Sequence, residues 1–186
     1  MRQISRAAGF VLGFAVPLAA EPIATIETGA GVALPAGYAV LDIRDEDSCF
    51  AGAPPGSRCL PAEQLLYSDA GQPLGFHALR WALGTLGLTG AETLVIYPGT
   101  QVPRDDALAA AALVYLCGQR QVLVHDGPAQ EDRDGAQVRA LWRDVIYTAP
   151  MRTGEMAVGA TPEGSLRDRL KTYATGGDAV AFAPGT

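Results

Sequence analysis

The sequence is poor in basic residues and in histidine. Its 186 residues include 14 Lys and Arg against 20 Asp and Glu, which gives a formal net charge of −6 at pH 7. Proteins that bind nucleic-acid backbones need a basic face, so this balance argues against a DNA or RNA partner. Histidine occurs only as His77 and His125, which excludes a site built from several histidines. The chain also lacks a glycine-rich phosphate loop, a Ser-His-Asp order and a metal-ligand cluster. We therefore expect no metal and no cofactor.

Apolar runs long enough to cross a bilayer comfortably are missing as well. Residues 7–20 are fourteen residues without a charge, and two arginines lie among the six residues before them. A bilayer span takes ~20 apolar residues, so this layout predicts a secretory signal peptide over residues 1–20 and a periplasmic or secreted protein. Because Pro17 and Leu18 suit a cleavage site after Ala20 poorly, a retained N-terminal anchor is an alternative. A buried helix of a cytosolic protein is another. Contact with a membrane is expected only if the segment is retained.

Strands and helices alternate along the rest of the chain. Short apolar runs predict buried strands at 38–43, 93–97 and 121–124, and the prolines and glycines of 51–57 predict a loop. Helical patterns cover 61–66, 76–86, 105–116 and 138–146, and a last helix is expected from Thr161-Pro162 to Tyr173. This order predicts an α/β domain with a parallel sheet over 36–150. A lead-in with one edge strand (21–35) precedes it, and an extension (151–186), whose end is ordered only if docked, follows it.

Four segments in order carry a family resemblance: YAVLDIRD, FAGAPPGSRCLP, LGLTGAETLVIY and QVLVHDGP. Together with the Ala-rich helix that ends in LCG, they resemble the rhodanese (sulfurtransferase) family between Ala36 and Pro128. The resemblance implies a rhodanese-like three-layer α/β domain with a central parallel sheet flanked by helices. The sequence departs from the family pattern where Ala53 and Pro54 replace His and Ile, and where Pro128 replaces a second glycine.

The resemblance also implies a catalytic cysteine directly after the strand 93–97, where the thiolate would carry the transferred sulfur as a persulfide. Proline stands there instead, and the following loop contains no cysteine: Pro98, Gly99, Thr100, Gln101, Val102, Pro103, Arg104. Its two prolines lack N–H groups that an anion cradle would use. Asp105 and Asp106, which we expect to cap the next helix, bring negative charge to its start. Sulfur transfer through this loop is therefore not expected, and neither is the phosphatase variant of the fold. The loop becomes a candidate binding loop.

Other polar residues receive structural interpretations. Asp42 and Arg44 match the family's Asp-x-Arg, which implies that they brace the neighbouring loop through hydrogen bonds and an ion pair. His125 and Asp126 predict a surface turn, with a proton- or ligand-binding pair as the alternative. His77 is expected to be solvated or to cap a helix. Two tryptophans, Trp81 and Trp142, are expected in the core or in docking contacts.

The three cysteines divide into a pair and a single residue. Cys49 and Cys59 flank the turn 51–57, so an exported chain is expected to join them in a disulfide. The alternative is a redox dithiol, but the C-x9-C spacing lacks the local activation of C-x-x-C. Cys117 is expected to be a buried apolar residue, with an exposed free thiol as the alternative.

These observations predict an exported rhodanese-like domain that is non-catalytic. Its partner would be an envelope protein or a small ligand at the loop 98–104, or it would have a structural role in an envelope complex. One alternative is a periplasmic sulfurtransferase or thiol-redox protein that uses Cys49 or Cys59. Another is an assembly subunit anchored by residues 1–20.

Overall fold

The centre of the molecule is a parallel β-sheet. The structure is a computed structural model, and it describes residues 23–27, 34, 36–67, 75–127, 145–159 and 162–182. The strands of the sheet lie in the order β1-β5-β4-β2-β3, and every pair is parallel. The strands are β1 Ile23–Ile26, β2 Ala39–Asp42, β3 Arg58–Cys59, β4 Thr93–Tyr97 and β5 Gln121–His125. The predicted parallel sheet and its edge strand in the lead-in are confirmed. The central strands form because their side chains are apolar on both faces, as strands covered by helices require.

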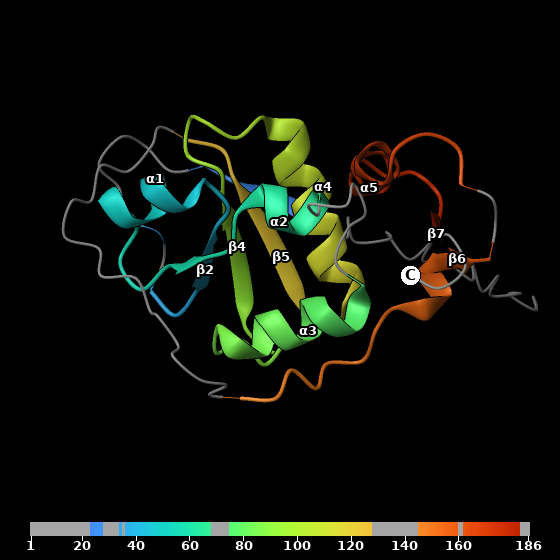
Figure 1. Ribbon diagram of the computed structural model, residues 1–186, viewed down its shortest axis with the longest axis horizontal. Coiled ribbons are helices and arrows are strands. Elements are labelled where there is room, and N and C mark those ends of the chain that lie inside the picture. Colours follow the sequence, from blue (N-terminus) through green and yellow to red (C-terminus); the bar gives the residue numbers. More distant parts are fainter. Residues whose placement is uncertain are drawn as a thin grey trace, which may run out of the picture.

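Helices flank the sheet, as Figure 1 shows. They are α1 Glu46–Ala51, α2 Ala62–Leu66, α3 Phe76–Thr85, α4 Arg104–Leu116 and α5 Leu166–Ala174. A 3-10 turn, η1 Thr153–Glu155, precedes a second, two-stranded parallel sheet of β6 Met156–Val158 and β7 Val180–Phe182. The positive φ of Gly87 and of Gly118 ends the predicted helices α3 and α4 where expected.

Helix α4 lies between the sheet and α5. It contacts β1, β4 and β5, and it also makes an extensive contact with α5. Five of its alanines are fully buried, and their small side chains allow close packing on several sides at once. The expectation that this helix is covered on most sides is therefore confirmed. Helix α5 packs on α4, and the strand β7 pairs with β6 in the second sheet.

Three expectations about elements need correction. The last helix begins after Ser165, whose Oγ accepts a hydrogen bond from the Asp168 N–H, and not at Thr161-Pro162. Gly164, with φ +69°, precedes this start. Helix α1 was not predicted. Trp81 lies on the outer face of α3 with 57% of its surface exposed, so it does not belong to the core.

Several expectations fall outside the described residues. These are the signal segment 1–20, most of the helix at 138–146, and Trp142. Within the described part of the chain, no helix is long and apolar enough to cross a membrane.

Candidate functional site

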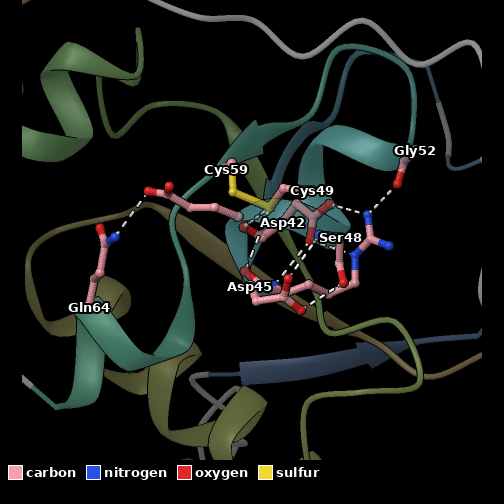
Figure 2. The surroundings of a disulfide bond; sticks show 9 residues. Asp42, Asp45, Ser48, Cys49, Gly52, Cys59 and Gln64 are labelled. Atoms are coloured by element: carbon pink, nitrogen blue, oxygen red, sulfur yellow. Dashed lines mark hydrogen bonds and ion pairs between the residues drawn. A yellow bond between two sulfur atoms is a disulfide. The ribbon is translucent and has the colours of Figure 1, made fainter.

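A disulfide joins α1 to β3 beside the carboxyl end of β2. Cys49 and Cys59 have Cα atoms 6.0 Å apart, and Figure 2 shows the bond together with the polar network next to it. The predicted pairing is thereby confirmed. Cys49 is the only buried residue of α1, so the disulfide is the main side-chain attachment of this helix to the core.

Asp42 and Arg44 form a buried ion pair at the end of β2. The Asp42 carboxylate is fully buried and accepts hydrogen bonds from Arg44 Nε at 2.9 Å and Nη2 at 2.6 Å. Nη2 also donates to the Gly52 carbonyl at 2.6 Å, which ties the loop after α1 to β2 (Figure 2). The hydrogen bond to Asp42 raises the pKa of Arg44 despite partial burial. Gly99 lies against the same side chain, because a Cβ there would be 2.6 Å from Arg44 Cδ.

The loop after β4 begins at a buried position and ends at the start of α4. Pro98 is buried directly beyond Tyr97, and its carbonyl accepts a hydrogen bond from the Val102 N–H at 3.3 Å. Pro103 takes the N-cap position of α4 without a side-chain cap. Arg104 forms an ion pair with Asp126. The cation in this loop is therefore already matched by a carboxylate.

The expected capping role of Asp105 and Asp106 is wrong. Both lie inside the first turn of α4, and their carboxylates pair with cations of α5. Lys171 Nζ lies 2.6 Å from Asp105, and Arg167 forms an ion pair with Asp106. The sequence gives no sign of these contacts, because the partners are more than sixty residues away.

A cleft opens between the loop, α2 and the start of α1, at the carboxyl ends of β2 and β4. Its volume is about 390 Å³, within the range of roughly 300–1,000 Å³ typical of ligand pockets. Of the seven candidate loop residues, three line it: Gln101, Val102 and Pro103. The other lining residues were not predicted as site residues: Ile43, Asp45, Pro61, Ala62, Glu63, Tyr67 and Asp106.

The cleft has apolar walls and an acidic lining. Among the described residues that line it, Asp45, Glu63 and Asp106 contribute three carboxylates, and none is Lys, Arg or His. Asp45 is the N-cap of α1, where it accepts hydrogen bonds from Ser48 N at 2.9 Å and Ser48 Oγ at 2.7 Å. Those bonds hold its pKa below the usual range, so Asp45 is ionised at neutral pH. The spacing Asp45-x-x-Ser48 is the signal that would have revealed both the cap and the helix.

His125 is buried and does not lie on a surface turn. It is the last residue of β5, with 4% of its surface exposed, and its ring centroid is 5.2 Å from that of Tyr97. The strand continues one residue further than predicted, which places the imidazole beside the Tyr97 ring instead of in solvent. Burial lowers the pKa of His125. His77, in the first turn of α3, is exposed.

The remaining thiol is inaccessible. Cys117 is fully buried, and burial raises its pKa to about 12. The interpretation of Cys117 as a packing residue is confirmed. Among the described residues, no group of three or more His, Cys, Asp and Glu side chains is placed to hold a metal ion.

Comparison with known proteins identifies the fold. No protein-family model and no curated protein sequence matches the chain. A structure of EanB with hercynine is similar at 17% identity and TM-score 0.51, over 65% of this chain and 33% of that one. A structure of EanB carrying a cysteine persulfide, with ergothioneine, is similar at 18% identity and TM-score 0.52, over 67% of this chain and 34% of that one. The chain thus spans about a third of the length of these proteins. A probable thiosulfate sulfurtransferase matches at 20% identity and TM-score 0.43, over 68% of this chain and 54% of that one. With a central five-stranded parallel sheet flanked by helices, the chain has a rhodanese-like α/β fold.

Proposed function

We propose that the protein is a non-catalytic, rhodanese-like binding module of the cell envelope, which binds a partner in the cleft beside the loop 98–104. The observation that carries this proposal is Pro98, which stands directly after β4 where the family resemblance implies a catalytic cysteine. The loop from Pro98 to Arg104 contains no cysteine and so supplies no thiol. The fold would then be retained for its cleft and not for sulfur transfer.

The state of the cysteines supports the absence of thiolate chemistry. A nucleophilic cysteine must be both ionised and accessible. Cys49 and Cys59 are joined in a disulfide, and Cys117 is buried with its pKa raised to about 12. None of the three therefore offers a thiolate to a sulfur donor at neutral pH.

The electrostatics of the cleft point the same way. Anionic sulfur donors such as thiosulfate are repelled by carboxylates, and of the three carboxylates on the described lining residues only Asp106 has an ion-pair partner, Arg167. Pro98 and Pro103 each lack the N–H that would otherwise stabilise an anion in the loop. These features favour a neutral or cationic partner over a sulfane anion.

An envelope location is part of the proposal. Disulfides persist in oxidising compartments, so the Cys49–Cys59 bond agrees with the signal-peptide pattern of residues 1–20. N-terminal sequencing of the native protein tests this, because a cleaved signal removes residues 1–20 and an anchor retains them. Retention would change the proposal from a soluble module to a membrane-anchored one.

A thiosulfate:cyanide sulfurtransferase assay tests the non-catalytic assignment. We expect no turnover above that of the same protein with Cys49, Cys59 and Cys117 all replaced by serine. Turnover by the wild type that disappears in the serine variant would overturn the proposal. It would favour instead the alternative of a sulfur-handling enzyme that uses one of these thiols.

Capture from envelope extract tests the cleft. Val102→Asp adds a charge inside the cleft, and Ile146→Asp adds the same charge at a residue that is 65% exposed and does not line it. We expect a partner retained by the wild type and by Ile146→Asp to be lost with Val102→Asp. Equal capture by both variants would place the interaction elsewhere. Unchanged circular dichroism of the two variants controls for folding.

A further inference from the structure

The cleft combines an apolar lining with carboxylates that are not all neutralised. Ile43, Ala62 and Val102 contribute aliphatic side chains, and Tyr67 is 43% exposed. Such walls suit the methylene stem of a long side chain, which can remain in apolar contact while its charged end reaches polar groups.

The cations near the cleft already form ion pairs with other carboxylates, which leaves a negative charge on the cleft lining. Four carboxylates at or near the loop form ion pairs with cations: Asp42 with Arg44, Asp126 with Arg104, Asp105 with Lys171, and Asp106 with Arg167, which also pairs with Asp168. Within the part of the chain that the structure describes, Asp45 and Glu63 have no such ion pair. The described lining therefore carries two carboxylates without an ion-pair partner beside an apolar surface.

We propose that this cleft binds a lysine or arginine side chain carried by an extended segment of a partner polypeptide, an inference that rests on the binding function proposed above. The stem packs on the aliphatic wall, and the cation is held by Asp45 and Glu63. Tyr67 also lines the cleft, where its aromatic ring adds a group that attracts cations. An acidic side chain meets like charge here, and a purely apolar one removes water from carboxylates without replacing it.

A segment of polypeptide suits the cleft better than a free amine. A small amine must recover its whole loss of translational and rotational freedom, at least ~4 kcal/mol, from these few contacts. A side chain on a partner shares that loss with the rest of the interface. The cleft then selects the charge of one side chain, while neighbouring exposed residues such as Gln101 contact the backbone beside it.

The test uses the full oxidised chain, labelled with ¹⁵N, and four hexapeptides that differ at one central residue: lysine, arginine, norleucine or glutamate. Norleucine keeps an aliphatic stem without the charge, so the comparison of lysine with norleucine isolates the cation. Amide resonances of Ala62, Glu63, Gln101 and Val102 report occupancy of the cleft. We expect the lysine and arginine peptides to shift these resonances and to bind about fivefold more tightly than norleucine, the sum of two exposed charge pairs. The glutamate peptide should bind most weakly.

A matched pair of double variants separates the cleft from the overall charge. Asp45→Asn with Glu63→Gln removes the two lining charges that have no ion pair and keeps the α1 cap, because asparagine caps helices as well as aspartate. Glu27→Gln with Asp178→Asn removes two exposed carboxylates that do not line the cleft. We expect the first variant to lose the preference for lysine over norleucine and the second to keep it. Thermal unfolding of both variants confirms that they fold.

The outcomes distinguish this inference from the function on which it rests. Equal binding of lysine and norleucine peptides, a preference that survives in Asp45→Asn/Glu63→Gln, or shifts only outside the cleft would overturn the ligand class. A free amine such as cadaverine that binds as tightly as the lysine peptide would overturn the polypeptide partner. The binding function itself would survive each of these results. It would fail only if no peptide bound and the wild type showed cysteine-dependent sulfur transfer.

Discussion

Removing the Cys49–Cys59 disulfide should cost the protein about 2.8 kcal/mol of unfolding free energy. The bond closes a loop of about eleven residues, since the two cysteines are ten positions apart. In the chain-entropy relation, the cross-link lowers the entropy of the unfolded chain by 2.1 + 1.5R ln n cal/mol/K, which gives about 2.8 kcal/mol at 25 °C. The variant Cys49→Ala/Cys59→Ala tests this value without placing a hydroxyl in the buried site of Cys49.

Urea unfolding measures the effect directly. With a slope of about 1–3 kcal/mol per molar urea, the midpoint of the double variant should fall by about 1–3 M relative to the oxidised wild type. Wild type treated with a reductant should unfold close to the double variant. Because Cys49 is the only buried residue of α1, limited proteolysis should also cut residues 46–57 faster once the bond is absent.

The control is the double variant with and without reductant, which should give a single curve. The reasoning is refuted if the variant is as stable as the oxidised wild type to within about 0.5 kcal/mol. It is equally refuted if reductant destabilises the double variant, because the effect would then not come from this bond.

Four further outcomes are expected. Gly99→Ala should lower stability by about 1–2 kcal/mol in thermal unfolding, because the residue has φ +56° and lies against Arg44; an unchanged melting temperature would contradict this. Asp42→Ala should cost about 3–5 kcal/mol by leaving Arg44 unpaired, and a second change, Arg44→Met, should recover part of the loss if the ion pair is the cause. Burial lowers the pKa of His125, so near pH 6.5 the unfolded chain binds a proton that the folded chain does not. The free energy of unfolding should therefore fall as the pH drops from 7.5 to 5.5. This dependence on pH should be weaker in His125→Gln. Mass spectrometry after iodoacetamide treatment without reductant should show no label on the native protein and one label, on Cys117, after denaturation, whereas two or three labels would favour a dithiol enzyme.

The regular core could be predicted because its signals are local. TLVIY at 93–97 is an uninterrupted apolar run, and the structure makes it a strand with the same bounds. The Ala-rich pattern of 105–116 and Gly118 after it predicted the next helix to within one residue. Such segments carry their burial pattern in the sequence itself, so no knowledge of distant contacts is needed.

Helix α1 escaped prediction for a physical reason. It has six residues and buries only one of them, so no amphipathic period can be read from its sequence. Its stability comes from the Asp45 cap and from the disulfide to β3. Only the cap is formed by neighbouring residues, so only the cap can be recognised in the local sequence.

Most residues that line the cleft could not be predicted from the sequence either. The resemblance directed attention to the loop after β4, yet most lining residues come from α2 and from the residues after β2. The acidic start of α4 could be read from the sequence, but its function could not. Asp105 and Asp106 form ion pairs with Lys171 and Arg167, respectively. The positions of these two cations depend on the packing of α5 against α4.

The strand order has a consequence for how the chain acquires its structure during synthesis. Strand β1 leaves the ribosome before the other strands of the central sheet, but β5, its partner among the described residues, follows nearly a hundred residues later. The outer cover of α4 comes later still, from α5 at residues 166–174. Translation must therefore pass residue 174 before the contacts among these elements can all form, and nascent chains that stop before residue 165 lack the cover that α5 gives to α4.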